Sequence, residues 1–181
     1  MSLLFLPVDI DLTDLDFTIG DRSIELKEYN PYWSSTPISD IVKLSQGFDK
    51  ILSQLPFTKI TTLTHKIQQR KVEGHVDVYP SMTFEEGEYE HIKDNEPCGY
   101  RFVLQGSLTA LKVFNGREYV IAKLPKTPCC YLLNSTQGKH SVDEDIGREI
   151  IYVRGFIDKE KHNELINRSM IKYQEYVISL L

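Results

Sequence analysis

The feature that most constrains the fold is a series of short segments rich in β-branched and aromatic residues between residues 57 and 158. Turn residues interrupt these segments, which is typical of strands joined by short loops in an antiparallel sandwich or barrel. Asn115-Gly116, between two of the segments, predicts a hairpin with a type I′ turn. The expected strands are 58–64, 72–79, 100–104, 108–114, 119–124, 130–133 and 149–156.

Two helices are expected to flank this β region. Ser39 is a suitable N-cap for a first helix that Pro56 ends, and Asp158 is a suitable cap for a second helix that runs to Leu181. A length of 181 residues suits one domain. We expect a lead-in with its supporting helix, a β core and a C-terminal helix, over residues 1–56, 57–158 and 159–181.

Charge and the N-terminus exclude several functional classes. The formal net charge is −5 with acids and bases interspersed, whereas nucleic-acid binding requires a basic patch, so no nucleic-acid partner is expected. The N-terminal apolar run is short and reaches acids at Asp9 and Asp11, so neither a signal peptide nor a membrane span is expected. Three cysteines without Cys-x-x-Cys spacing favour a reduced, cytoplasmic setting.

Within the β region, His75-Val76-Asp77 and the distant His140 could bind one metal ion. Residues two apart in a strand point to the same face, so His75 and Asp77 can project together while Val76 points away. His140 lies in a later β segment, and a sheet that folds back, as in a jelly-roll barrel, would bring it to the pair. Two imidazoles and one carboxylate on one face of an ion are the facial triad of non-haem iron oxygenases.

The His-x-acid pattern has low specificity by itself. The chain has 26 acidic residues, and His162-Asn163-Glu164 in the predicted C-terminal helix is a second match. His75 and Asp77 could instead be an exposed pair on an edge strand, and His140 could be a surface turn residue. The metal-site interpretation therefore depends on the strand context, on the distant histidine and on Arg148 at the start of the next predicted strand.

Three segments together resemble the catalytic core of the Fe(II)- and 2-oxoglutarate-dependent dioxygenases. They are Tyr100-Arg101-Phe102-Val103-Leu104, Leu133 to Val142 with Gly138-Lys139-His140-Ser141-Val142, and Arg148-Glu149-Ile150-Ile151-Tyr152-Val153. The chain is most similar to the aspartyl/asparaginyl β-hydroxylase branch, over roughly residues 72–158. Val103 stands where that branch has a second histidine, and Asp77 is present although that branch often lacks it.

The resemblance implies a double-stranded β-helix, a jelly-roll, cupin-like barrel. His75, Asp77 and His140 would bind Fe(II), Arg148 would bind the C5 carboxylate of the co-substrate 2-oxoglutarate, and Arg101 would lie near its C1 carboxylate or the substrate. The implied reaction uses O2 to hydroxylate a C–H bond of an amino-acid, peptidyl or other small-molecule substrate, while 2-oxoglutarate becomes succinate and CO2.

Several of these residues have alternative roles. An arginine suits the co-substrate because its planar guanidinium matches a carboxylate with two hydrogen bonds. Arg148 could instead pair with an acid of residues 143–145, and Arg154 is a second candidate for the carboxylate anchor. Arg101 could form a structural salt bridge. Asn134 could support His140, since ligating histidines usually donate their other N–H to a polar partner.

Two other functions stay open at this point. The first is a cupin-like metal enzyme that uses the same triad without 2-oxoglutarate, in which Arg148 would not be needed. The second is a non-catalytic, ligand-binding β-barrel whose histidines are structural. The substrate and the oligomeric state are not predicted.

Overall fold

The fold is mainly β, as a computed structural model describes it for residues 2–13, 28–30, 33–37, 48–77, 84–88, 90–91 and 99–181. These residues form two antiparallel sheets and two α-helices, α1 (Phe48–Ser53) and α3 (Lys159–Lys172). The prediction of a mainly β fold with flanking helices is confirmed.

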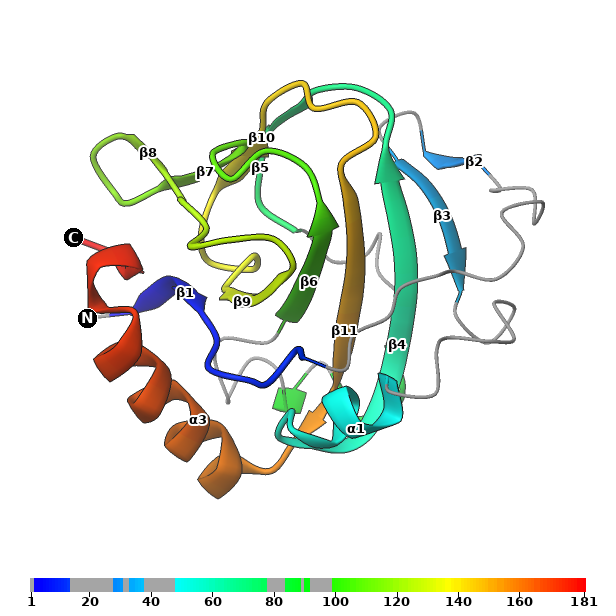
Figure 1. Cartoon of the computed structure of the whole chain (residues 1–181), viewed down its shortest axis with the longest axis vertical. Helices are drawn as coiled ribbons and strands as arrows, with labels where there is room; N and C mark the ends of the chain where they lie inside the picture. The colour runs from blue at the N-terminus through cyan, green and yellow to red at the C-terminus, as the bar shows by residue number, and fades with distance from the viewer. Residues whose placement is uncertain are drawn as a thin grey trace.

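The larger sheet contains eight strands within the described residues, and its longest strands, β4, β11 and β6, lie side by side (Figure 1). Four of its strands, β1, β2, β3 and β12, come from outside the predicted β core, because the N-terminal lead-in and the C-terminus also pair with it. In spatial order the strands are β12 (Ile178–Ser179), β1 (Leu3–Pro7), β9 (Cys129–Leu133), β6 (Gly99–Gln105), β11 (Glu149–Ile157), β4 (Phe57–Gln68), β3 (Trp33–Pro37) and β2 (Glu28–Asn30).

The smaller sheet contains four strands within the same residues. Their spatial order is β5 (Val72–His75), β10 (His140–Val142), β7 (Leu111–Phe114) and β8 (Tyr119–Ile121). The chain crosses repeatedly between the sheets, since β4, β6, β9 and β11 belong to the larger one and β5, β7, β8 and β10 to the smaller one. Among the described strands no hydrogen-bonded pair links the two sheets, so they do not close into a single barrel.

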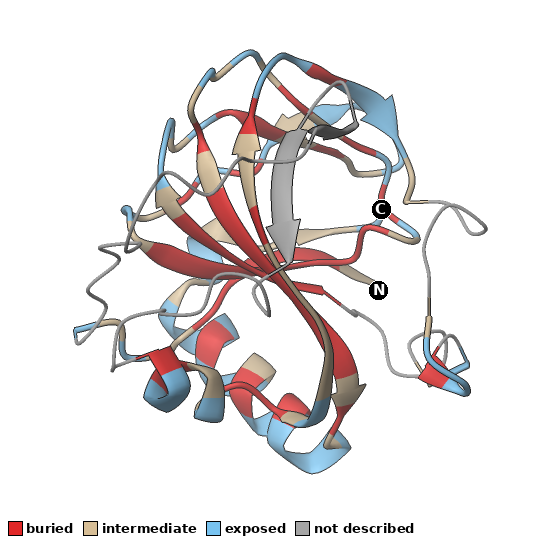
Figure 2. Cartoon of the chain, turned by 90° about the vertical axis from the view of Figure 1, so that its right-hand side faces the viewer, coloured by how far each residue is buried: buried red, intermediate tan, exposed pale blue. Residues whose placement is uncertain are grey.

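Alternating side chains of the larger sheet form two cores, one on each face. Val103 of β6 and Ile150 of β11 pack against the smaller sheet, in a cluster that includes Leu111 and Val142. Their sequence neighbours on the opposite face pack with residues of α1 and α3. Figure 2 shows both helices beneath the strands, with their buried residues turned toward the sheet. One face of the sheet is therefore covered by helices and the other faces the smaller sheet.

The C-terminal helix begins where the sequence predicts but ends earlier. The Asp158 carboxylate accepts hydrogen bonds from the backbone N–H groups of Glu160 and Lys161 at 3.1 and 3.2 Å. The helix ends at Lys172 and a 3-10 turn follows, so the prediction of a helix to Leu181 is wrong. The last residues instead pair with β1, which satisfies backbone groups that a helix would have satisfied internally.

The first helix agrees with the prediction where it is described. It runs from Phe48 to Ser53 and buries Phe48 and Ile51, and it ends before Pro56. The expected N-cap, Ser39, lies outside the described residues.

The Asn115-Gly116 pair does lie in a hairpin, between β7 and β8, but not in a two-residue type I′ turn. Phe114 pairs with Tyr119, so the loop has four residues. The Asn115 side-chain oxygen accepts hydrogen bonds from the N–H groups of Arg117 and Glu118, both at 3.0 Å. This local bonding of an asparagine to its own turn stabilises the longer loop.

Candidate metal centre

The two histidines of the predicted triad face each other across a strand pair. His75 is the last residue of β5 and His140 the first residue of β10, and the two are cross-strand partners in the antiparallel ladder. Their ring centroids lie 4.5 Å apart. Because directly opposite residues share a face of the sheet, both imidazoles project from the same side.

Asp77 reaches the histidines by a route that strand alternation does not explain. β5 ends at His75, so Asp77 follows the strand. The predicted strand 72–79 is therefore wrong at residues 76 and 77, which are not in a strand, and residues 78 and 79 lie outside the described part. The Asp77 N–H donates to the Ser135 carbonyl at 2.8 Å, which ties the segment to the loop before β10. Its Oδ1 lies 3.4 Å from His75 Nε2 and 3.9 Å from His140 Nε2.

His75, Asp77 and His140 thus bring three ligand atoms within 4.8 Å of one another. The His140 side chain is 8% exposed, Asp77 21% and His75 43%, so the group opens to solvent on the His75 side. A metal ion held there could be approached from that side by another ligand.

Hydrogen bonding aims one nitrogen of each imidazole at the centre of the group. His75 Nδ1 lies 2.8 Å from the Glu73 carbonyl, and His140 Nδ1 lies 3.1 Å from the Gly138 carbonyl. A carbonyl can only accept, so each Nδ1 carries a hydrogen, and in the neutral imidazole the lone pair is on Nε2. Such an outer hydrogen bond fixes the tautomer that a metal-binding histidine needs.

Asn134 supports His140 through the backbone turn rather than as the acceptor of its Nδ1–H. The Gly138 N–H donates to the Asn134 carbonyl at 2.8 Å, and the Asn134 side chain accepts from the Gln137 N–H at 3.2 Å. These bonds shape the turn that presents the Gly138 carbonyl to His140.

The electrostatics of the group keep Asp77 ionised and His140 neutral, which are the protonation states that bind metal. Burial raises the pKa of Asp77, but the His75 hydrogen bond and the Arg101 charge outweigh it and hold that pKa well below its usual value. Burial lowers the pKa of His140 to about 4, so this imidazole is neutral near pH 7. The Asp77 hydrogen bond raises the pKa of His75, so in the metal-free protein this imidazole is the one that favours the protonated state, and a bound metal would have to displace its proton.

Arg101 lies beside the triad, where it restrains Asp77. Its Nη2 is 3.4 Å from Asp77 Oδ2, its Nη1 donates to the Gly99 and Leu133 carbonyls at 3.4 Å each, and its guanidinium lies 4.8 Å from the Tyr152 ring centroid. Gly99 leaves room for this arrangement, since a Cβ there would lie 2.9 Å from Nη1. Arg101 therefore forms the salt bridge that was the alternative to a role in ligand binding, and its partner in that salt bridge is Asp77 of the triad.

Arg148 is buried without an acidic partner in the part of the chain that is described. It is 1% exposed, and its guanidinium makes one weak hydrogen bond, to the Tyr131 hydroxyl at 3.4 Å. Its Nε has no hydrogen-bond partner. Asp143 pairs with Lys112 instead, and Asp145 bonds backbone and loop groups, so the alternative pairing of Arg148 with these acids does not occur.

Arg154, the second candidate for a carboxylate anchor, already has a partner. Its Nε lies 2.6 Å from Glu88 Oε1, and Glu88 is fully buried. Glu88 also accepts a hydrogen bond from the Thr61 hydroxyl at 2.7 Å. Arg154 is therefore neutralised within the protein, and Arg148 is the more suitable of the two to bind an external carboxylate.

Several residues around the triad were not singled out from the sequence. Their side chains or backbone contact Asp77 or one of the arginines Arg101, Arg148 and Arg154, or lie near them, from segments that are distant in sequence, and neither spacing nor motif marks them. They are Lys66, Glu88, Tyr131, Ser135 and Tyr152. In the second His-x-acid match the histidine has a structural role, since His162 is buried and its Nδ1 lies 2.8 Å from the Tyr100 hydroxyl, with which it forms a hydrogen bond.

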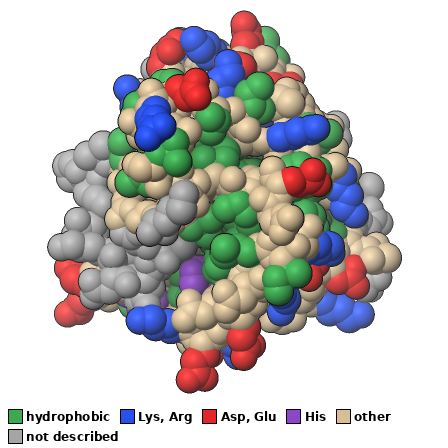
Figure 3. Space-filling view, turned by 90° about the vertical axis from the view of Figure 1, so that its left-hand side faces the viewer, with side chains coloured by type: hydrophobic (Ala, Val, Ile, Leu, Met, Phe, Trp, Pro, Cys, Tyr) green, Lys and Arg blue, Asp and Glu red, His purple; other side chains and the backbone are tan. Residues whose placement is uncertain are grey.

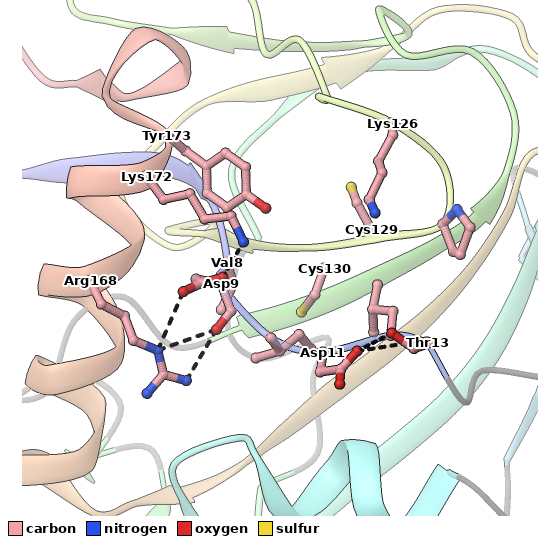
Figure 4. Close-up of a pocket in the computed structure, with 13 residues that line it drawn as sticks. Val8, Asp9, Asp11, Thr13, Lys126, Cys129, Cys130, Arg168, Lys172 and Tyr173 are labelled. Carbon is pink, nitrogen blue, oxygen red and sulfur yellow. Dashed lines mark hydrogen bonds and ion pairs between the residues drawn. The ribbon is translucent and has the colours of Figure 1, made fainter.

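A hollow of about 680 Å³ lies away from the triad, between α3 and the segment after β1. In it Asp9 pairs with Arg168 and Lys172, as Figure 4 shows, so these charges satisfy one another.

The face in Figure 3 carries acidic and basic side chains interspersed around apolar ones, with a histidine among them. Neither the hollow nor this face indicates a second chemical site.

The comparisons with known proteins do not assign the chain to a family. No protein-family model matches it, and no curated protein matches it. Among the described residues, no helix has the length and apolar character needed to cross a membrane.

Proposed function

We propose that the protein is an Fe(II)- and 2-oxoglutarate-dependent dioxygenase that hydroxylates a C–H bond of an amino-acid, peptidyl or other small-molecule substrate. The observation that carries this proposal is the convergence of His75 Nε2, His140 Nε2 and the Asp77 carboxylate within 4.8 Å. Two imidazoles and a carboxylate with an open side are the donor set of the non-haem iron oxygenases.

The strand order supports a double-stranded β-helix as the finer description of the fold. Successive strands from β4 to β11 alternate between two facing antiparallel sheets, with β7 and β8 adjacent in one of them. Jelly rolls distribute their strands between two sheets in a comparable way. In the proposed fold the triad lies at the end of the smaller sheet and Arg148 lies inside, at the start of β11.

The donor set fits Fe(II) by its chemistry. Both imidazoles present Nε2 because their Nδ1–H groups are engaged by carbonyls, and Asp77 is held as a carboxylate beside Arg101. Borderline nitrogen donors with one hard oxygen donor suit divalent transition metals. Three protein ligands leave further positions for a co-substrate and O2.

Arg148 supports the use of 2-oxoglutarate in particular. A buried guanidinium without an acid is costly, because its charge has lost water and gained no counter-ion. A bound carboxylate would supply that counter-ion through two parallel hydrogen bonds. The Tyr131 hydroxyl, at 3.4 Å from the guanidinium, would offer the same carboxylate a further donor.

In the proposed reaction the substrate C–H, O2 and 2-oxoglutarate become the alcohol, succinate and CO2. When bound, Fe(II) and 2-oxoglutarate supply the oxidising chemistry. The chain binds and orients: Asp77 and the histidines hold the ion, Arg101 restrains Asp77, and Arg148 orients the co-substrate. Apolar residues of the core between the sheets, among them Val103 and Ile150, exclude water from the Arg148 side.

Fe(II)-dependent formation of succinate from 2-oxoglutarate tests the proposal. The wild type should form succinate, and Asp77→Ala and His140→Ala should abolish it, whereas the matched control Glu164→Ala, from the second His-x-acid match, should retain it. Anaerobic addition of 2-oxoglutarate to the Fe(II) protein should give a visible charge-transfer band. Metal binding without any effect of 2-oxoglutarate would support the cupin-like alternative, and no metal binding would support the ligand-binding barrel.

A further inference from the structure

Three side chains on neighbouring strands form a cationic wall beside the triad. Lys66 of β4 is the cross-strand partner of Ile150 of β11, and Tyr152 of β11 is the partner of Arg101 of β6. Cross-strand partners share a face of a sheet, and so do residues two apart in a strand. All of them therefore project toward the space between the sheets, where Arg101 meets Asp77.

The wall is held together by the Tyr152 ring. The Lys66 Nζ lies 5.2 Å from the ring centroid and the Arg101 guanidinium carbon lies 4.8 Å from it. Both distances are within the range of cation–π contacts. The aromatic ring thus places two cations near one another without neutralising either.

The cations around the triad differ in what already neutralises them. Arg101 contacts Asp77, and Arg154 pairs with the buried Glu88. The Lys66 ammonium makes no hydrogen bond and no ion pair to any described residue, although the side chain is half-buried. Burial, together with the Arg101 charge, lowers the pKa of Lys66 to about 8, which reflects the cost of keeping this ammonium charged.

Lys66 and Arg148 are two separate unneutralised cations with different access. Arg148 is almost fully buried against Tyr131 of β9, whereas Lys66 is half-buried on β4. A ligand that arrives from solvent after the co-substrate can reach the half-buried group. Since the proposed function assigns Arg148 to the co-substrate, the counter-ion of Lys66 is assigned to the second ligand, the substrate.

We propose that the substrate carries an anionic group, a carboxylate or a phosphate, which binds Lys66 beside the triad. This inference rests on the proposed function for the assignment of the bound molecule as a substrate. The ammonium would supply the charge-assisted hydrogen bond, and the Tyr152 ring would form the adjoining apolar wall. Substrates with an acidic group would thereby be selected over neutral amides.

The direct test follows lysine Cε signals by NMR in the full chain, without added metal, with inorganic phosphate, acetate and neutral acetamide as probes. The Lys66 signal is the one that disappears in Lys66→Met. It should shift saturably with phosphate or acetate but not with acetamide, while the exposed Lys123 signal stays unchanged. Comparison of the two dissociation constants shows whether the site prefers a phosphate or a carboxylate.

Substitutions separate charge from structure. Lys66→Met should weaken binding of the preferred anion about tenfold, as expected for a lost charge-assisted hydrogen bond, and Lys66→Arg should restore it. Lys123→Met should have no effect. A Lys66 signal that does not respond to either anion, or responds equally to acetamide, would overturn the proposal.

A second measurement keeps this inference distinct from the proposed function. In the Fe(II) protein without O2, Lys66→Met should leave 2-oxoglutarate affinity unchanged, whereas Arg148→Met should weaken it. An equal loss in both variants would assign Lys66 to the co-substrate and overturn the substrate proposal. If 2-oxoglutarate does not bind at all but the anion still shifts the Lys66 signal, the dioxygenase proposal fails while the anion site stands.

Discussion

His75 and His140 are cross-strand partners with ring centroids 4.5 Å apart, although they come from strands separated by most of the β region. Their pairing depends on strand register, because a shift of one residue would place Ser141 opposite His75 and turn His140 to the other face. The neighbouring pairing of His140 with Val113 of β7 holds β10 in this register from its other side.

This pairing predicts that a divalent metal stabilises the folded chain. Co(II) at about 100 times its dissociation constant should add about 2.7 kcal/mol to the free energy of unfolding, since it binds the assembled triad and not the unfolded chain. Thermal unfolding with and without Co(II) measures this as a rise in Tm. His140→Ala should lose the rise and Glu164→Ala should keep it; an equal rise in both would place the metal elsewhere.

Replacing Arg148 with Met should separate stability from ligand binding. The metal-free protein should be no less stable than the wild type, because a buried guanidinium without an acid is removed. Affinity for 2-oxoglutarate should fall about tenfold or more, as charge-assisted hydrogen bonds to its carboxylate are lost. Chemical denaturation and calorimetric titration of the metal-loaded protein measure the two effects. Unchanged affinity would argue against Arg148 as the carboxylate anchor.

Replacing Arg154 with Met should have the opposite effect on stability. Glu88 is fully buried and lies 2.6 Å from Arg154 Nε, so the substitution leaves an uncompensated buried carboxylate. The expected loss is about 3–5 kcal/mol. Arg168→Met, at a half-exposed arginine near Asp9, should cost about 1 kcal/mol or less in the same denaturation assay. Similar losses in the two variants would contradict this account.

The cysteines of β9 should resist alkylation in the folded protein. Burial raises the pKa of Cys129 to about 12, and burial together with the neighbouring Cys129 raises the pKa of Cys130 well above its usual value. A raised thiol pKa keeps the reactive thiolate a very small fraction even at about pH 9, and burial blocks the reagent, so labelling should stay slow at that pH. Iodoacetamide treatment followed by peptide mass spectrometry should show both residues unmodified until denaturant is added. Rapid labelling of either in the native protein would contradict their burial.

Strand and helix positions were largely predictable, because they depend on local residue preference and periodicity. β6, β9 and β11 lie within a residue or so of the expected segments, and Asp158 caps α3 as its residue type suggests. The predictions that failed concern chain ends and loops. The helix ends at Lys172 and the last residues pair with β1. Local residue preference could not predict this pairing, because β1 lies at the other end of the chain.

The candidate site divides in the same way. His75, Asp77, His140 and Arg148 could be selected from the sequence by residue type and spacing. The distinction between Arg148 and Arg154 could not, because it depends on Glu88, which reaches Arg154 from a segment distant in sequence. Lys66 carried no signal in the sequence for the same reason.

The sequence by itself determined the mainly β character, the helix cap and the set of residues able to bind a metal, since these follow from local chemistry. The tertiary structure decided which of those residues meet, which nitrogen each histidine presents, and which cations stay without a counter-ion. These properties depend on register and on contacts between strands far apart in the chain. Burial then sets the cost of every charge that such contacts leave unpaired.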